Sequence, residues 1–176
     1  RPFSLGRFCC ATTRFSRTVR ERNTRRPCGT SAMPLCEMVS GASPETVSPN
    51  SAIDPRRGFL TEARFPGVAI LHGWPDEALV AHGLDRRTAV VTLSHDSKLD
   101  DPALHAALGS NVYYIGALGS QRTQAKRRAR LAEAGFDAAT IARIHGPVGL
   151  DIGAANPAEI ALSIAAELIA CLRKPR

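Results

Sequence analysis

The sequence predicts an α/β fold, in which helices cover both faces of a parallel sheet, for residues 52–172. Segments typical of strands alternate there with segments typical of helices, an order that implies parallel strands joined by right-handed crossovers. Residues 88–93 are apolar or β-branched at odd and even positions alike, as expected for a strand buried on both faces. Residues 1–50 show no period of 2 or 3.6, so no element is predicted there.

Strands are predicted at residues 52–53, 67–71, 88–93 and 112–115. The first ends at Asp54, because Pro55 cannot continue a central strand and pushes Asp54 toward an extended conformation. The second is a short apolar run, and a short helix is expected to follow it, after Trp74. The last leads into residues 116–120, which are expected to turn the chain into a long basic helix.

Longer helices are predicted at residues 101–108, 121–134, 137–144 and 157–172. Asp101 is expected to cap the first of these, with Pro102 at its first position. Asp137 is expected to cap the third. Asn156 and Glu159 form the pattern of a capping box at the start of the last helix, which is strongly apolar.

Residues 1–51 differ in composition from the rest, and we expect them to be a disordered or non-native segment before a domain at residues 52–176. The formal net charge is +7, and residues 1–50 contribute +5 of it, from eight Arg against three Glu. Four of the five cysteines also lie there, Cys9, Cys10, Cys28 and Cys36, without the C-x-x-C spacing of a zinc site.

Charge and hydropathy exclude two classes of partner. Nucleic-acid binding needs basic residues clustered on a shaped surface, whereas this chain has its excess charge in an unpatterned segment. The apolar runs are shorter than the ~18–20 residues that a membrane-spanning helix requires. We therefore expect a cytoplasmic protein that binds neither nucleic acid nor membrane.

The best candidate for an anion site is the turn that contains Gly116, Gly119, Ser120 and Arg122. It follows a strand and opens a helix, so free backbone amides, the helix dipole and the Arg122 side chain are expected to face one point. A tight turn with Ser120 as an ordinary N-cap would use the same residues. The sequence leaves both interpretations open.

Two further loops carry polar candidates at strand ends, where ligands bind in parallel sheets. His95 and Asp96 end the strand at residues 88–93, although Asp96 is equally suited to capping the turn that follows. His145, Gly149 and Asp151 lie in a glycine-rich loop, which is either a binding loop or an irregular turn in which Asp151 pairs with Arg143 or with loop amides.

No metal site is predicted, because the five histidines show no ligand spacing. Lys126, Arg127, Arg128 and Arg130 are interpreted as the solvated face of their helix rather than a phosphate site. The apolar residues of the last helix are interpreted as core, with partner contact as the alternative.

Six motifs in order resemble the C-terminal Rossmann domain of the XdhC/CoxI family over residues 52–172. They are Asp-Pro-Arg at 54–56, Arg-Phe-Pro at 64–66, Ser-His-Asp at 94–96 with Asp-Asp-Pro-Ala-Leu at 100–104, Tyr-Ile-Gly-Ala-Leu-Gly-Ser at 114–120 with Arg-Thr at 122–123, His-Gly-Pro-Val-Gly-Leu-Asp-Ile-Gly at 145–153, and Pro-Ala-Glu-Ile-Ala at 157–161. The family's first strand, its glycine-rich turn and its N-terminal cysteine domain are not readable in residues 1–51.

The resemblance implies a Rossmann-like three-layer parallel sheet that lacks a readable first strand. It also implies an accessory factor that binds molybdenum cofactor (molybdopterin) without using it catalytically and inserts it into a molybdenum hydroxylase apoenzyme of the xanthine dehydrogenase type. A cysteine desulfurase and a second copy of the chain are further candidate partners. The expected cofactor-binding residues are Asp54, Arg56, His95, Asp96, Gly116, Gly119, Ser120, Arg122, His145, Gly149 and Asp151.

Three other functions remain open at this point. Asp54 stands where a Rossmann enzyme places the carboxylate that binds a ribose, so an NAD(P)-dependent oxidoreductase is one alternative, although no G-x-G-x-x-G is present. A module that docks a molybdoenzyme through its last helix is another. The third is a non-functional fragment, because a sheet without its first strand would lose one side of its ligand crevice.

Overall fold

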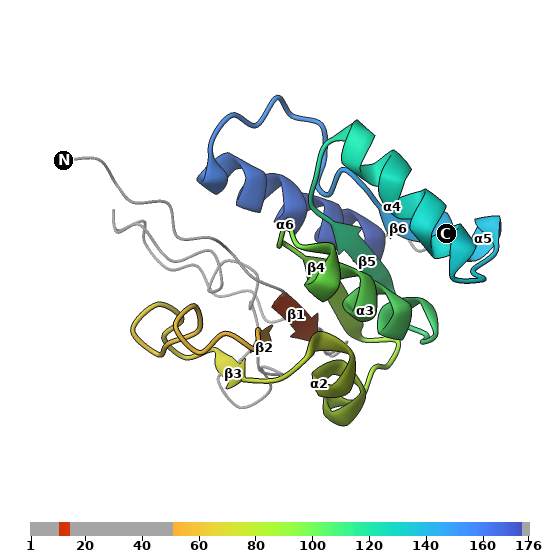
Figure 1. The fold of residues 1–176 in the computed structure, drawn as a ribbon. Coiled ribbons are helices and arrows are strands. Elements are labelled where there is room, and N and C mark those ends of the chain that lie inside the picture. Colours follow the sequence, from red (N-terminus) through yellow and green to blue (C-terminus); the bar gives the residue numbers. More distant parts are fainter. Residues whose placement is uncertain (1–10, 15–50, 174–176) are drawn as a thin grey trace.

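The structure is a computed structural model that describes residues 11–14 and 51–173 (Figure 1). The elements, in chain order, are β1 (Ala11–Arg14), β2 (Ser51–Ile53), β3 (Ala69–Leu71), α2 (Pro75–His82), β4 (Thr88–Thr92), α3 (Ser97–Leu108), β5 (Tyr114–Ala117), α4 (Gln121–Glu133), α5 (Ala138–Ile141), β6 (Ile144–His145) and α6 (Pro157–Arg173). The alternation of strands and helices confirms the α/β class.

The strands form one sheet in the order β3-β2-β1-β4-β5-β6. β2 pairs with β3, and β4, β5 and β6 pair in turn, all in parallel. β1 is antiparallel to both of its neighbours, with Ala11 opposite Ala52 on one side and Val91 on the other. β2 and β4 therefore run in the same direction, and the loops after β2, β4, β5 and β6 emerge at one edge of the sheet.

β1 is the main departure from the sequence prediction. It lies in residues 1–50, for which no element was predicted, and it occupies the central position that the sequence left empty. Four residues are too few to show a period, and strand pairing uses backbone groups that every residue carries. The other predictions for residues 1–50, including those for the four cysteines, lie outside the described residues.

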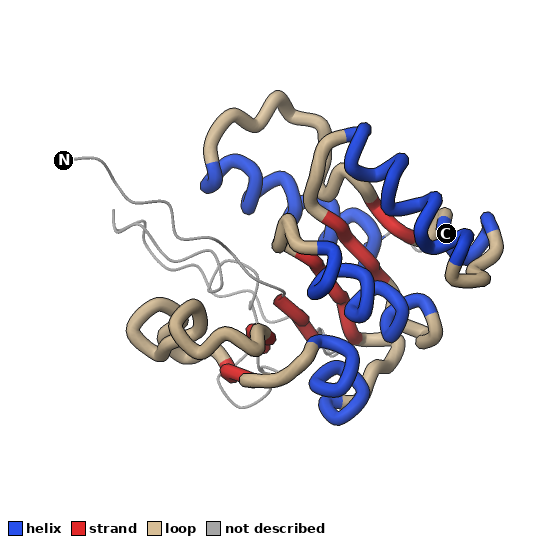
Figure 2. The backbone as a smooth tube through the Cα atoms, in the orientation of Figure 1, coloured by secondary structure: helices blue, strands red, loops and turns tan. Residues whose placement is uncertain are grey.

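The core has two layers, one on each face of the sheet, because successive strand residues point to opposite faces. Val90 and Ile115 face a cluster built with residues of α2, α3, α4 and α5. Ala89, Val91 and Tyr114 face a second cluster that includes Leu168 of α6. Figure 2 shows α3 and α6 on opposite sides of the strands. This arrangement confirms the three-layer fold.

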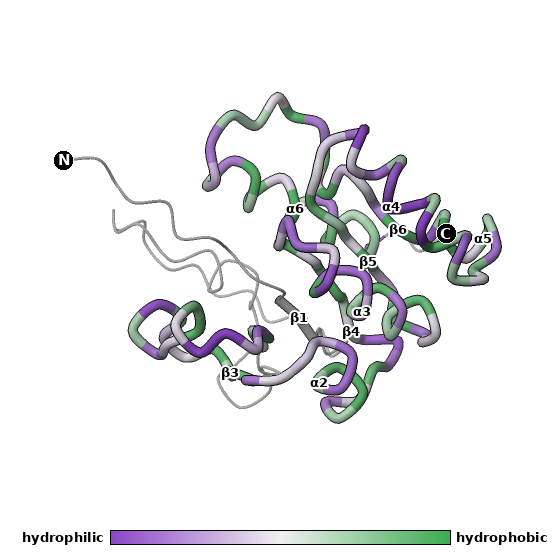
Figure 3. The backbone as a smooth tube through the Cα atoms, viewed as in Figure 1, coloured by the Kyte–Doolittle hydropathy of each residue, from purple (hydrophilic) through white to green (hydrophobic). Residues whose placement is uncertain are grey.

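The two longest helices after β5 differ in hydropathy. Figure 3 shows α4 as largely hydrophilic and α6 as largely hydrophobic. The capping box at the start of α6 is present, because Glu159 N donates to Asn156 Oδ1 at 3.0 Å and the Glu159 carboxylate accepts from Ala155 N at 2.7 Å. In the described part of the chain, no helix combines the length and the apolar character needed to cross a bilayer.

Several element boundaries differ from the prediction, and three of these differences change an element or its cap. α3 begins at Ser97, because the Asp96 side chain accepts from Lys98 N and caps it there. The expectation that Asp101 caps this helix is wrong, because Asp101 and Pro102 lie inside it. The helix expected at residues 137–144 ends at Ile141, and Ile144–His145 pairs with β5 as β6. β5 extends through Gly116 and Ala117, so only residues 118–120 form the turn into α4.

Candidate functional site

The turn between β5 and α4 has the geometry of a helix N-terminus open to an anion. Ser120 is the N-cap of α4, and its Oγ accepts from Thr123 N at 3.3 Å. Gly119 has a φ of +135°, and a Cβ on it would come within 2.9 Å of Thr123. Arg122 is exposed, in the first turn of the helix. Gly119, Ser120 and Arg122 thus lie together at the start of α4, and their binding of an anion stays a prediction.

Gly116 belongs to the strand rather than to the turn. It is buried in β5, and a Cβ there would lie 2.6 Å from Val148 Cγ2 and 2.8 Å from the ring of Tyr114. Close packing explains why residue 116 is a glycine. The expectation that Gly116 contributes to the turn is wrong.

A buried ion pair lies directly behind the turn. Arg127 of α4 donates from Nη2 to Asp100 Oδ2 of α3 at 2.9 Å, and the exposed fractions of the two side chains are 4% and 3%. The same Nη2 donates to Leu118 O at 3.1 Å. The interpretation of Arg127 as part of a solvated face is therefore wrong, because this side chain turns inward to a carboxylate and to the backbone of the turn.

Two neutral side chains extend this ion pair to both strand ends. Gln124 accepts from Arg127 Nη1 at 2.6 Å and donates to Ala117 O at 2.8 Å. Ser94, just after β4, donates to Asp100 Oδ1 at 2.6 Å. We call Ser94, Asp100, Gln124 and Arg127 the strand-end network. It joins the loop after β4 to the turn after β5.

Burial raises the pKa of Asp100 above its ordinary value of 3.8, and the hydrogen bond from Ser94 and the charge of Arg127 only partly offset that effect. A carboxylate with this much desolvation needs its cationic partner, because removal of the partner would leave a buried charge uncompensated. The buried charge of Asp100 therefore depends on the other side chains of the strand-end network.

Asp54 and Arg56 form a tight local pair after β2. Asp54 is 1% exposed, and its Oδ1 accepts from Arg56 N at 2.7 Å and from Arg56 Nε at 2.9 Å. Its Oδ2 accepts from Arg56 Nη2 at 2.8 Å. The Arg56 guanidinium in turn lies 4.4 Å from the centre of the Phe59 ring. Both carboxylate oxygens are thus engaged by Arg56.

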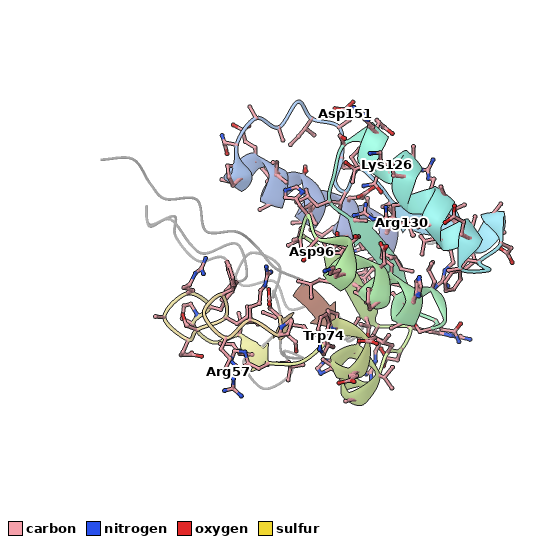
Figure 4. The ribbon with its side chains drawn as sticks, viewed as in Figure 1. Arg57, Trp74, Asp96, Lys126, Arg130 and Asp151 are labelled. Atoms are coloured by element: carbon pink, nitrogen blue, oxygen red, sulfur yellow. The ribbon has the colours of Figure 1, made fainter. Side chains whose placement is uncertain are left out.

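The remaining candidates at this edge are more exposed. His95 and Asp96 are exposed on the loop after β4, where Asp96 acts as the N-cap of α3, the simpler of the two interpretations offered by the sequence. Asp151 is exposed on the loop before α6 (Figure 4). Its suggested pairing with Arg143 is wrong, because Arg143 donates to the carbonyls of Leu108, Ser110 and Val112.

His145 belongs to a second polar cluster on the α6 side of the sheet. Its Nδ1 lies 2.9 Å from Glu167 Oε1, and its ring stacks on Tyr114 with centroids 4.6 Å apart. Glu167 Oε2 accepts from Tyr114 Oη at 2.6 Å and from Gly149 N at 2.8 Å. Gly149 has a φ of +97°, and a Cβ on it would clash with Ser163 Oγ, so only glycine fits there.

Burial raises the pKa of Glu167, but the hydrogen bonds from Tyr114, Gly149 and His145 outweigh this effect and lower it below the ordinary value of 4.5. Burial, followed by the hydrogen bond to Glu167 and its charge, raises the pKa of Tyr114 well above its ordinary range. Glu167 is therefore an anion that accepts three hydrogen bonds, and Tyr114 is a neutral donor.

Sequence reasoning missed Asp100, Gln124, Arg127 and Glu167. Glu167 was detectable, because it is the single charge between Glu159 and Arg173 in an apolar helix. Gln124 and Arg127 share the buried stripe of α4 with Leu131, at a spacing typical of an inward face. Among the described residues, no group of three or more His, Cys, Asp or Glu side chains is placed to bind a metal ion.

Comparison with known proteins identifies the family of this fold. The model of the XdhC Rossmann domain matches residues 29–168. The match begins before Ala52, inside the segment that the sequence suggested to be foreign. Residues 94–96, 114–123 and 145–153, which form the loops described above, all lie within the match.

Relatives of known sequence and structure agree with this match. The molybdenum cofactor insertion chaperone PaoD of Escherichia coli (strain K12) is 39% identical over 85 residues, which are 48% of this chain and 27% of that protein. A probable xanthine dehydrogenase subunit of Bacillus subtilis (strain 168) is 32% identical over 117 residues, 66% of this chain and 33% of that protein.

A solved structure described as a xanthine dehydrogenase from Bacillus halodurans has a TM-score of 0.59 and 30% identity, and the likeness covers 72% of this chain and 36% of that one. The chain thus spans about a third of the length of such relatives or less. The matching domain, strand order and sequence together show that this chain belongs to the XdhC Rossmann domain family.

Proposed function

We propose that this chain belongs to an accessory protein that binds molybdenum cofactor and inserts it into a molybdenum hydroxylase of the xanthine dehydrogenase type. Family membership and the name of the related insertion chaperone support an accessory function. The proposed action is binding and transfer, and the chain does not catalyse a reaction on the cofactor.

The observation that carries the proposal is the open N-terminus of α4. The backbone N–H groups of Gln121 and Arg122 have no acceptor within the described part of the chain, and the Arg122 side chain is exposed beside them. Two unpaired amides, the helix dipole and a guanidinium suit a phosphate group, which molybdopterin carries. Gly119, Ser120 and Arg122 would bind that phosphate.

The strand-end network supports this site by fixing its backbone. Arg127 and Gln124 hold the carbonyls of Leu118 and Ala117, so the peptide groups that enter the turn are fixed before a ligand arrives. When the backbone of a binding site is already fixed, ligand binding loses less conformational entropy. The exposed residues His95, Asp96 and Asp151, together with Arg56 beside Asp54, would line the rest of the crevice, and the His145–Gly149 loop would close it.

The geometry at Asp54 disfavours the NAD(P)-dependent alternative. A ribose-binding carboxylate must accept hydrogen bonds from ribose hydroxyls. Here Arg56 already donates three hydrogen bonds to the two oxygens of Asp54, and the Asp54 side chain is fully buried. We therefore place molybdenum cofactor ahead of a dinucleotide.

Equilibrium binding to the 176-residue chain tests the proposal. Arg122→Ala removes one charge-assisted contact to phosphate, typically about 1.5–3 kcal/mol, and is expected to weaken molybdenum cofactor binding by about tenfold or more. Arg128→Ala is the matched control, because Arg128 is exposed on the same helix beyond its first turn. It is expected to change the affinity less than twofold, and NAD is expected not to compete.

Two results would count against this function. Equal affinity of the wild type and Arg122→Ala for molybdenum cofactor would remove the proposed phosphate site. Saturable binding of NAD with no binding of molybdenum cofactor would favour the dinucleotide alternative instead.

A further inference from the structure

Cys171 completes a chain of three side chains, and its thiol and the Glu167 carboxylate have no function in the proposed cofactor site. It lies on α6 four residues after Glu167, so both side chains lie on the same face of the helix. Its Sγ lies 3.9 Å from Nε2 of His145, whose Nδ1 contacts the Glu167 carboxylate at 2.9 Å. The three residues are arranged as thiol, imidazole and carboxylate, in that order.

The carboxylate determines how the imidazole is protonated. Because the pKa of Glu167 is lowered, its carboxylate is ionised near neutral pH and can only accept hydrogen bonds. The contact with Glu167 Oε1 therefore requires the proton of neutral His145 to be on Nδ1. The lone pair is then on Nε2, the nitrogen that faces Cys171 Sγ.

The imidazole is also fixed in orientation. Tyr114 Oη and Gly149 N hold the second oxygen of Glu167, at 2.6 Å and 2.8 Å. The aromatic ring of Tyr114 stacks on the imidazole with an interplanar angle of 30°. Cys171 and His145 are both partly exposed. A proton acceptor in a fixed tautomer beside a partly exposed thiol is the arrangement that activates a cysteine nucleophile.

We propose that Cys171 is a nucleophilic thiol activated by His145 and positioned through Glu167, and that it undergoes thiol–disulfide exchange with small disulfides. This site shares the His145–Gly149 loop with the proposed cofactor site, but Cys171 and Glu167 lie on α6 and make no contact with the proposed phosphate. Tyr114, which positions Glu167, begins β5, whereas the anion-binding turn follows the end of that strand.

The surroundings favour a sulfur electrophile over an acyl substrate. Acyl transfer develops an oxyanion that needs hydrogen-bond donors. The nearby donors Tyr114 Oη and Gly149 N are both committed to Glu167. Attack on a disulfide displaces one sulfur by another and develops no oxyanion, so it requires only a thiolate and a proton acceptor.

The exchange step balances without an external oxidant or reductant. Cys171 transfers its thiol proton to His145 Nε2, and the thiolate attacks one sulfur of a disulfide R–S–S–R. The S–S bond of the disulfide breaks as a new S–S bond forms to Cys171. The departing thiolate R–S⁻ takes the proton back from His145 as R–SH. Cys171 is oxidised to a mixed disulfide, and one sulfur of the substrate is reduced.

The base is needed because of where Cys171 lies. It is in the last turn of α6, where the partial negative charge of the helix disfavours a thiolate. Three other ionisable side chains near Cys171 do not stabilise a thiolate, because they are neutral or negatively charged: Tyr113, Tyr114 and Glu167. Arg173 in the same turn is the nearby cation on α6. His145 Nε2 is the proton acceptor that lies beside this thiol.

The test is the pH dependence of Cys171 alkylation by iodoacetamide in the whole chain. Trypsin releases residues 144–173 as a peptide whose only cysteine is Cys171, so mass spectrometry reports this thiol separately from the other four. The reference is the same thiol in the urea-unfolded chain, which should titrate at about 8.5. The folded chain is expected to show a midpoint at least about one pH unit lower, in the range of imidazole-paired thiols.

Variants and a second reagent complete the experiment. His145→Gln is expected to lose that shift and to slow the reaction of Cys171 with bis(2-hydroxyethyl) disulfide at pH 7 about fivefold or more. His105→Gln is the matched control, because His105 packs against Phe136 on the other face of the sheet and should leave both rates unchanged.

A wild-type midpoint at or above that of the unfolded chain would overturn the proposal, even if His145→Gln does not fold. So would a folded His145→Gln variant that reacts at the wild-type rate. Either result would leave Cys171 as a packing residue of the cluster beneath α6.

Discussion

Single residues join the separate parts of this domain, and Glu167 is the clearest case. Its carboxylate connects β5 through Tyr114, β6 through His145 and the following loop through Gly149. Its exposed side-chain fraction is 15%, so most of these contacts are shielded from solvent. The glycine-rich loop is thus tied to the sheet by one side chain of α6.

Glu167 should make the stability of the domain depend on pH. A carboxyl group whose pKa is lowered on folding stabilises the native state above its unfolded pKa, and this contribution is lost as the pH falls through the folded value. The difference in unfolding free energy between the wild type and Glu167→Gln should therefore shrink as the pH falls below 4.5. Urea unfolding between about pH 3 and 5.5 measures this difference.

Glu133→Gln serves as the control, because Glu133 is exposed on α4. If the difference in unfolding free energy between the wild type and Glu167→Gln instead grows as the pH falls, the pKa of Glu167 is not lowered by folding.

Two ion pairs join α3 and α4, and they differ in burial. Arg127 pairs with Asp100, and both side chains are almost fully buried. Arg130, labelled in Figure 4, pairs with Asp101 through two hydrogen bonds of 2.6 Å and 2.9 Å, but its side chain is 41% exposed. The same two helices therefore carry a buried pair and a partly exposed pair, which use adjacent acids on α3 and arginines one turn apart on α4.

The two pairs should respond differently to the loss of their arginine. Arg127→Ala leaves the Asp100 carboxylate buried without its cation, which typically costs about 3–5 kcal/mol. Arg130→Ala removes a partly solvated partner and should cost at most about 1 kcal/mol. Urea unfolding of the two variants at pH 7 measures both costs, and equal losses would show that burial does not determine the strength of these contacts.

At the scale of the whole molecule, β1 determines whether the sheet is continuous. The strand order places it between β2 and β4, so it joins the two sets of parallel strands. All the loops of the candidate site belong to strands on either side of it. Their relative placement across the sheet therefore depends on a four-residue strand.

Proline at residue 12 tests this placement. Thr12 pairs with Ser51 on one side and Val90 on the other, and Thr12→Pro removes a backbone donor from a central strand. The acceptor that is left unpaired typically costs about 1–3 kcal/mol. Hydrogen exchange of amides in β2 and β4 should become faster. Thr12→Val keeps the amide and should leave exchange unchanged. If Thr12→Pro also leaves exchange unchanged, β1 is not required for the sheet.

The local features of this protein could be predicted from its amino-acid sequence. Residues 88–93 were identifiable as a doubly buried strand because their pattern is continuous, and Ser120, Asp137 and Asn156 were identifiable as caps because capping acts over three residues. The order of strands and helices was sufficient for the α/β class, since parallel strands need crossovers. Each of the family motifs also lies within one short stretch of the sequence, so it could be recognised without the fold.

The groups that meet across the fold could be identified only from its three-dimensional arrangement. The spacing of Arg127 and Leu131 is compatible with an inward face of α4, but only the fold shows that the partner of Arg127 is Asp100 of the neighbouring helix. His145, Glu167 and Cys171 come together because β6 lies beneath α6. β1 was unreadable because pairing through backbone groups leaves little trace in side chains. Long-range contacts depend on chain topology, which no local pattern records.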